Sequence, residues 1–197
     1  MTKIVEFYFD VGSPTAYLAY NRLKQLQKQY NCVIDYRPVL LGGLFKASGN
    51  SSPVMVPAKG RYMMMDDLPR FAKLYDVPLN NNPHFPINTL NLMRGAVAAL
   101  HGDYFDTYIS AVFNAIWVDS KNMGDMETVI EVLSTAGLNA PSILESTQDA
   151  DIKAKLITNT EAAVKRGLFG APTMFVDEEM FFGQDRLQFV EMALQTK

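Results

Sequence analysis

The chain has almost no cysteine: Cys32 is the only one among 197 residues. A single thiol cannot form an internal disulfide, so the sequence excludes both a disulfide framework and dithiol exchange within one chain. Cys32 adjoins an apolar stretch, and we interpret it as a small packing residue.

Histidine and basic charge are also scarce. His84 and His101 lie far apart in the sequence and neither begins a spacing typical of a zinc site, so we expect no metal. Lys and Arg (18) are outnumbered by Asp and Glu (21), and the net charge is -3. An excess of acidic residues does not supply the positive charge that is typical of nucleic-acid-binding proteins. The expected partner is therefore a small molecule and not a nucleic acid.

Long hydrophobic runs are missing as well. Asp10 interrupts the first apolar segment too early for a signal peptide, and no run approaches the roughly 20 residues of a membrane span. We therefore expect a cytoplasmic protein without a membrane partner. The composition, 48% hydrophobic and 20% charged, suits one packed domain or one domain with a large insertion.

The first apolar stretch predicts a strand, a tight turn and a helix. Ile4 to Phe9 is rich in β-branched and aromatic residues, which are typical of a buried strand. Gly12 breaks the strand, and the pattern predicts Ser13 as the N-cap of a helix and Pro14 as its first residue. The N–H groups at a helix start favour a negative group beside them. The Ser13 hydroxyl therefore caps the helix or donates to a bound anion, and this stretch leaves both open.

The remaining pattern predicts strands near both ends and helices between them. A second strand is predicted over 32–41, parallel to the first because a helix connects the two. Gly42-Gly43 and the residues up to 56 are predicted as loop, and so is 77–86. Helices are predicted over 57–75, 89–100, 104–118, 126–136 and 146–166, with a break at 137–141; two short strands then follow at 173–176 and 180–182. A terminal helix is predicted to turn the following residues toward the core: Leu187, Phe189, Val190, Met192 and Leu194.

Four stretches resemble a known family. They are F-D-V-G-S-P-T-A-Y-L-A at 9–19, A-I-W-V-D-S-K-N-M-G-D at 115–125, G-A-P-T at 170–173 and F-F-G-Q-D-R-L at 181–187. Their order over essentially the whole chain resembles the thioredoxin-like fold with a DsbA-type helical insertion. More narrowly, the chain is similar to the kappa-class glutathione transferases and the bacterial 2-hydroxychromene-2-carboxylate isomerases, and the stretch at 115–125 is closer to the isomerases.

The resemblance implies an α/β fold of thioredoxin-like type, β-α-β … β-β-α, with a large all-helical insertion. Residues 1–45 and 167–197 would form the thioredoxin-like domain, and residues 46–166 the helical insertion domain. Redox members of the wider fold carry C-x-x-C where this chain has S-P-T-A from Ser13 onward. Without either sulfur, dithiol exchange at that position is excluded.

The resemblance also implies a glutathione site. Ser13 would donate its hydroxyl to the glutathione sulfur, and Ala171, which precedes a cis Pro172, would pair its backbone with the tripeptide. Gln184 and Asp185 would hold the γ-glutamyl end. An ordinary trans turn proline at Pro172 and a helix cap at Asp185 remain alternatives, and the two roles of Asp185 are compatible.

Two further residues match family positions at the other end of the ligand. Asn50 would contact glutathione, and Lys59 would bind its glycyl carboxylate, with Arg61 as a nearby competitor. Asn50 as a turn residue and Lys59 as a solvated cation remain alternatives. By helical spacing, Phe113 and Trp117 are predicted as core residues, with a substrate wall as the alternative.

The implied activity is a glutathione-dependent isomerisation of 2-hydroxychromene-2-carboxylate-type compounds to trans-o-hydroxybenzylidenepyruvate-type products, in the degradation of aromatic compounds. The implied cofactor is glutathione, the substrate a small aromatic molecule and the assembly a homodimer. Two alternatives remain open. One is a kappa-class-like glutathione transferase, and the other is a non-catalytic DsbA-like binding module.

Overall fold

The computed structural model describes residues 2–196, which contain one mixed sheet of four strands. The strands are β1 (Ile4–Phe9), β2 (Val33–Pro38), β3 (Thr173–Val176) and β4 (Glu179–Phe182). Their order in the sheet is β2-β1-β3-β4, where β1 pairs in parallel with β2 and antiparallel with β3, and β3 pairs antiparallel with β4. The parallel pairing of the first two strands is as predicted, although the second strand ends at Pro38, whose ring nitrogen cannot donate to a ladder.

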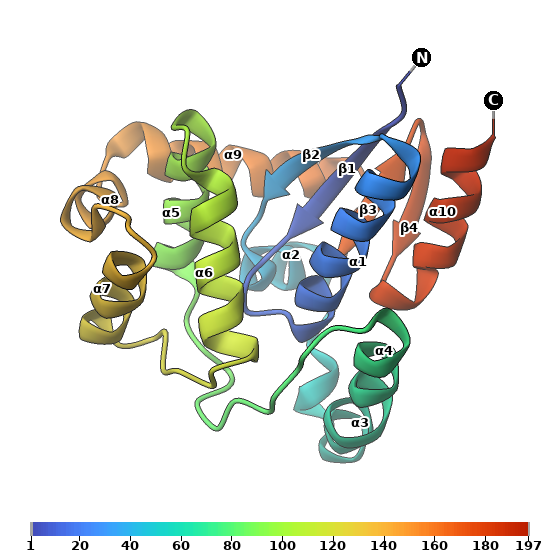
Figure 1. Cartoon of the computed structure of the whole chain (residues 1–197), viewed down its shortest axis with the longest axis horizontal. Helices are drawn as coiled ribbons and strands as arrows, with labels where there is room; N and C mark the ends of the chain where they lie inside the picture. Colours follow the sequence, from blue (N-terminus) through green and yellow to red (C-terminus); the bar gives the residue numbers. More distant parts are fainter. Residues whose placement is uncertain (1, 197) are drawn as a thin grey trace.

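Helices cover both faces of the sheet (Figure 1). The helices α1 (Pro14–Tyr30) and α10 (Leu187–Gln195) lie on one face, and α2 (Leu41–Ser48) and α9 (Ala150–Lys165) lie on the other. Alternation along β1 explains both layers, because successive side chains of a strand point to opposite faces. Phe7 and Phe9 belong to the main core, whereas Tyr8 belongs to a smaller cluster with Leu44 of α2 and Ala163 of α9.

The remaining helices lie beside the sheet in two groups (Figure 1). The first group is α3 (Pro57–Tyr62) and α4 (Leu68–Tyr75), which the π-helical turn Met63–Asp67 joins into one stretch. The second is α5 (Leu90–His101), α6 (Phe105–Trp117), α7 (Met126–Thr135) and α8 (Ala140–Ser146), which pack against one another in sequence order. Phe113 and Trp117 are fully buried, so their predicted core role is confirmed.

Three helical predictions were wrong. The segment that begins at Gly42-Gly43 was predicted as a loop but forms α2, because Leu44 of this segment is fully buried against the sheet. The predicted break over 137–141 contains the start of α8, where Asn139 accepts from the Ser142 N–H and the following proline occupies the first turn. The predicted helix 146–166 starts later, at Ala150, because the Asp149 carboxylate caps it.

The terminal helix also differs from its prediction in one respect. Leu187, Val190 and Leu194 are buried as predicted, since they share one face of α10. Phe189 and Met192 are 43% and 61% exposed, so the prediction that they face the core was wrong.

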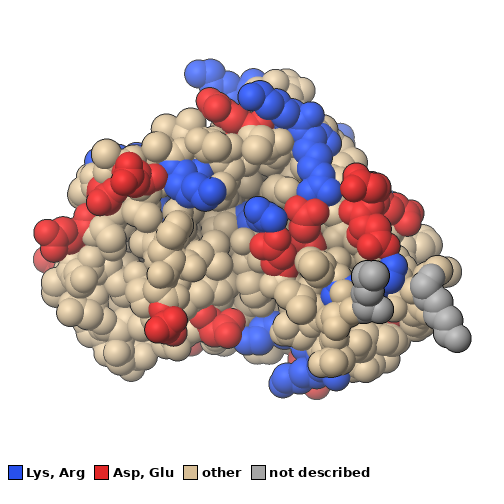
Figure 2. All heavy atoms as spheres, turned by 90° about the horizontal axis from the view of Figure 1, so that it is seen from above, with Lys and Arg blue, Asp and Glu red and all other residues tan. Residues whose placement is uncertain are grey.

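The predicted domain boundaries remain a prediction. α9, which they place in the helical insertion, contacts β2 of the sheet as well as α5. Within residues 2–196, no helix is both long and apolar enough to cross a membrane. On the face drawn in Figure 2, positive and negative side chains are interspersed.

Candidate active site

The site begins where β1 ends and α1 starts. The Ser13 N–H donates to the Asp10 carbonyl oxygen at 3.0 Å, which closes the turn between the strand and the helix. Ser13 itself is extended, with φ -94° and ψ 116°, and its Oγ accepts from the Ala16 N–H at 3.1 Å. Ser13 is therefore the N-cap of α1, with Pro14 as the first helical residue, as predicted.

The Ser13 hydroxyl has two further polar contacts. It donates to the Ala171 carbonyl oxygen at 3.1 Å, and its Oγ lies 2.7 Å from the Thr15 Oγ1. Capping uses an oxygen lone pair, whereas donation uses the hydroxyl hydrogen, which rotates about the Cβ–Oγ bond. The two roles predicted as alternatives for Ser13 are therefore compatible in this geometry.

The loop before β3 faces Ser13. The Ala171–Pro172 peptide bond is cis, and both residues are buried. The Pro172 carbonyl accepts from the Gly183 N–H at 3.0 Å, which fixes this loop against the segment after β4. Within the described part of the chain, the Ala171 N–H has no hydrogen-bond acceptor, so it is available to a ligand.

The segment after β4 supplies the next wall. Gly183 has φ 97°, and a Cβ on it would lie 2.5 Å from Asp185 Oδ1, so the turn requires glycine. Gln184 is only 6% exposed, and its side-chain amide makes no hydrogen bond within residues 2–196. Asp185 is half-buried and pairs with Arg186, and it caps neither the 3₁₀ turn Gln184–Arg186 nor α10. The alternative prediction that Asp185 is a helix cap is therefore wrong.

These segments enclose one cavity of about 760 Å³. This volume lies in the range of small-molecule sites. All the predicted site residues line it except Lys59: Ser13, Asn50, Ala171, Pro172, Gln184 and Asp185. Asn50 donates from Nδ2 to the Phe169 carbonyl at 2.8 Å, so part of its amide is already used to hold the loop. Lys59 and Arg61 are exposed on α3 outside the lining.

The charges of the cavity lining are all negative. Asp10, Asp67 and Asp185 contribute carboxyl groups, and among the described residues no Lys, Arg or His lines the cavity. Such a lining suits an ammonium group of a ligand and leaves a ligand carboxylate to N–H groups or to neutral amides.

Sequence reasoning missed Asp10, which is 1% exposed. Its two carboxyl oxygens accept from the Gly12 N–H at 2.9 Å and the Leu41 N–H at 2.8 Å. Burial raises the pKa of Asp10, and hydrogen bonds from Leu41, Gly12 and the Thr89 side chain oppose this shift. Asp10 thus joins the Ser13 turn to the starts of α2 and α5. The sequence signal was a carboxyl group directly after a buried strand.

The apolar wall was also missed. Phe45, Phe85, Phe169 and Phe182 line the cavity and come from four distant segments. The rings of Phe169 and Phe182 lie 4.5 Å apart between centroids, and a Cβ on Gly170 would lie 2.8 Å from Phe182 Cε2. No spacing in the sequence could have brought these rings together, because only the tertiary fold does so.

Comparisons with known proteins agree with this architecture. Residues 4–195 match the family described as DSBA-like thioredoxin domain. The chain is 34% identical to a 2-hydroxychromene-2-carboxylate isomerase from Sphingobium xenophagum, over 98% of this chain and 99% of that protein. The chain belongs to this isomerase family within the DsbA-like thioredoxin proteins.

A solved isomerase structure supports this placement, and a kappa-class transferase is a further relative of similar length. A solved structure of a 2-hydroxychromene-2-carboxylate isomerase superposes with a TM-score of 0.86 at 31% identity, covering 97% of this chain and 94% of that chain. A glutathione S-transferase kappa 1 from Rattus norvegicus is 29% identical over 99% of this chain and 92% of that protein. The predicted thioredoxin-like fold with a DsbA-type insertion is confirmed, and membership in this family makes the chain an enzyme.

Proposed function

We propose that this chain is a glutathione-dependent isomerase of 2-hydroxychromene-2-carboxylate-type compounds, with trans-o-hydroxybenzylidenepyruvate-type products. One observation carries the proposal: a nearly buried hydroxyl, that of Ser13, lies at a helix start inside a cavity of small-molecule size. The Ser13 hydroxyl contacts the Ala16 N–H, the Ala171 carbonyl and the Thr15 hydroxyl, and none of these three is a base that would make it a nucleophile. A hydroxyl in this position is suited to stabilise an anion.

The residues around Ser13 are suited to glutathione in three places. The free Ala171 N–H offers a backbone donor, and the unpaired Gln184 amide and the Asp185 carboxylate offer partners for the γ-glutamyl end. When bound, glutathione would supply a thiolate that adds reversibly to a conjugated carbon of the ring-opened substrate, permits rotation about the resulting single bond and leaves unchanged.

The task of Ser13 is to stabilise that thiolate. A hydrogen bond to a charged group contributes about 1.5 to 3 kcal/mol, and one pKa unit corresponds to about 1.36 kcal/mol. A single donor therefore lowers the pKa of a thiol from about 8.5 to near neutral. The N–H groups at the start of α1 act in the same direction, since they favour a negative group.

The test is a pH titration of the glutathione thiolate absorbance in the complex. Ser13→Ala is expected to raise the pKa of the bound thiol by about one to two units and to slow isomerisation at neutral pH. Ser13→Thr keeps both the hydroxyl and the cap, and is the matched control. Full isomerase activity in glutathione-free buffer, or an unchanged thiol pKa in Ser13→Ala, would contradict the proposal.

A second candidate is a kappa-class-like transferase, which the 29% identity to the rat kappa-class protein favours. The two reactions differ in the mass of the product. Isomerisation leaves the mass of the substrate unchanged, whereas conjugation adds glutathione less any leaving group. Mass spectrometry of the product therefore separates the two candidates.

We further propose that the enzyme is a homodimer in the cytoplasm that takes part in the breakdown of aromatic compounds. This part rests on resemblance to the isomerase family. Light scattering of the purified protein tests the dimer, since one chain has a mass of 22.0 kDa and a dimer has twice that mass.

A further inference from the structure

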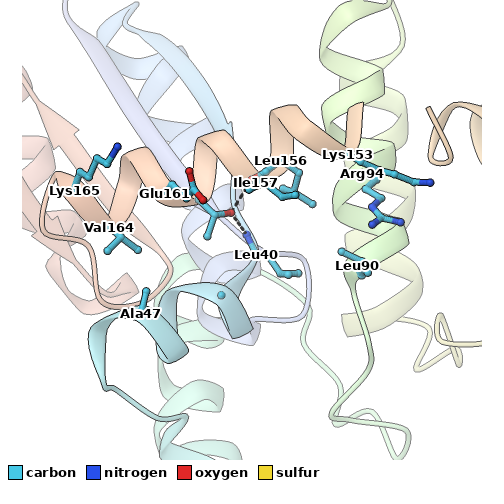
Figure 3. Close-up of a pocket in the computed structure, with 12 residues that line it drawn as sticks. Leu40, Ala47, Leu90, Arg94, Lys153, Leu156, Ile157, Glu161, Val164 and Lys165 are labelled. Carbon is cyan, nitrogen blue, oxygen red and sulfur yellow. Dashed lines mark hydrogen bonds between the residues drawn. The ribbon is translucent and has the colours of Figure 1, made fainter. Parts of the chain in front are cut away.

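A second cavity lies on the opposite side of α2, between α2, α5 and α9 (Figure 3). Its volume is about 380 Å³. Leu41 and Phe45 of α2 line the Ser13 cavity, whereas Gly43 and Ala47 of the same helix line the second one. Helix α2 is therefore the wall between two cavities that have no lining residue in common.

The floor of the second cavity is apolar. Leu156 of α9 is buried there, and Ile157 beside it is 58% exposed. The one hydroxyl of the floor, on Thr160, donates to the Leu156 carbonyl at 2.8 Å and accepts from the Leu40 N–H at 3.0 Å. Because both contacts are internal, Thr160 adds little polarity to the floor. The body of any ligand here must be apolar.

Positive charge gathers at one end of this cavity. Figure 3 shows Arg94 of α5 and Lys153 of α9 at that end, and Lys165 at the other. Both Arg94 and Lys153 are half-buried, and neither forms an ion pair within residues 2–196. Arg94 has only a long contact of 3.4 Å, from Nη1 to Asn91 Oδ1.

The one carboxylate in the lining is too distant to neutralise this end. Glu161 follows Lys153 by eight residues on α9, which places it ~12 Å further along the helix axis. It lies one turn from Lys165, toward the other end (Figure 3). The charges of Glu161 and Lys165 offset each other, so Arg94 and Lys153 leave a net positive end.

We propose that this second cavity binds a small apolar carboxylate, such as a bicyclic aromatic acid. Its ring system would pack on Leu156 and Ile157, and its carboxylate would lie between Arg94 and Lys153, where a guanidinium binds both oxygens. The volume lies within the range of known small-molecule sites. Among the described residues no cation lines the Ser13 cavity, so the second cavity differs from it in offering cationic side chains to a carboxylate.

The test is calorimetric titration with 2-naphthoate and with 2-naphthamide, which has the same rings without the charge. The double variant Arg94→Gln/Lys153→Gln is expected to weaken 2-naphthoate binding at least tenfold, or about 1.4 kcal/mol, and to leave 2-naphthamide unchanged. Lys155→Gln is the matched control, because Lys155 lies on α9 and is exposed outside the cavity. It is expected to bind 2-naphthoate like the wild type.

A second variant tests the apolar floor. Ile157→Ser is expected to weaken both ligands, and the exposure of Ile157 means that the fold does not depend on it. If the double variant binds 2-naphthoate as tightly as the wild type, the ligand lies elsewhere and the proposal is overturned. Absence of saturable 2-naphthoate binding to the wild type overturns it equally. Neither outcome bears on the glutathione site, which the thiolate titration tests separately.

Discussion

Ser13 and Asp10 are held at the end of β1 by opposite kinds of contact. Ser13 donates its hydroxyl hydrogen to the Ala171 carbonyl, whereas Asp10 only accepts, from the N–H groups of Gly12 and Leu41. The Asp10 carboxyl group therefore holds the turn, and the Ser13 hydroxyl lines the cavity. Because the hydroxyl hydrogen rotates about the Cβ–Oγ bond, a bound anion would compete with the Ala171 carbonyl for it.

Asp10 predicts a pH dependence of stability. Burial raises its pKa above the ordinary value of 3.8. A raised folded-state pKa contributes stability that is present below the unfolded pKa and is lost as the pH rises through the folded pKa. Above pH 3.8 the wild type therefore loses stability, whereas Asp10→Asn cannot ionise and does not. We expect the free energy of unfolding of Asp10→Asn minus that of the wild type to rise with pH above 3.8, by up to about 1.36 kcal/mol per pH unit. Urea unfolding between pH 4 and 8 measures it.

The control for this variant is Asp66→Asn, which changes an exposed carboxyl group of the same kind. Its stability relative to wild type should not follow the Asp10→Asn curve. A difference between Asp10→Asn and wild type that is constant with pH would contradict the role assigned to burial.

The glycyl end of glutathione gives a second prediction at this scale. Lys59 is exposed outside the cavity lining, so its contact with a carboxylate would be screened by solvent. Lys59→Ala is therefore expected to raise the Kd of glutathione only up to about fivefold, and Arg61→Ala less. Titration at low and high salt measures both. A larger effect from Arg61→Ala would transfer the role to Arg61.

Among the secondary-structure elements, α2 is the one that lines both cavities. Its start is held by Asp10 through the Leu41 N–H, and its two sides line the two cavities. The helix forms although two glycines lie in its first turn. The contacts that it makes with the sheet and with α9 outweigh the low helix propensity of glycine.

These two glycines provide a matched pair of variants. A Cβ on Gly42 would meet nothing within 4 Å, whereas one on Gly43 would lie 3.1 Å from Thr160 Cγ2. Gly42→Ala is therefore expected to stabilise the protein by up to about 1 kcal/mol, and Gly43→Ala to stabilise it less or to destabilise it. Thermal and urea unfolding compare the two. Equal effects would mean that Thr160 does not limit the packing of α2.

The elements also show how far the sequence could be interpreted. β1, the Ser13 cap and the positions of the four strands along the chain were predictable, because they depend on local propensity and on capping chemistry. Helix α2 was not predictable, because its two glycines suit a loop locally and its helical state depends on tertiary contact with α9. The outward positions of Phe189 and Met192 were missed because both residues are hydrophobic, although their spacing places them off the buried face.

At the scale of the whole molecule, the candidate site is assembled from both ends of the chain and from its middle. Ser13 follows the first strand, Pro172 precedes the third, and Asn50 lies after α2. The resemblance to a known family, rather than any local pattern, predicted that these segments meet. The four phenylalanines of the wall were beyond that prediction, because they come from α2, β4 and two loops that only the tertiary fold brings together.

A ligand that contacts all these segments should stabilise the whole fold. Glutathione at 100 times its Kd would add about 2.7 kcal/mol, which for a domain of this size raises the Tm by roughly 5 to 10 °C. Ser13→Ala should lower the free energy of unfolding by about 1 kcal/mol, because it removes the N-cap of α1. It should still show most of the glutathione-induced rise in Tm, because it alters the thiol pKa more than the contacts with the tripeptide. Gln184→Ala, which removes an unpaired amide from the cavity lining, should instead reduce the shift. Differential scanning calorimetry measures all three, and a wild type whose Tm is unchanged by glutathione would contradict the proposed glutathione site.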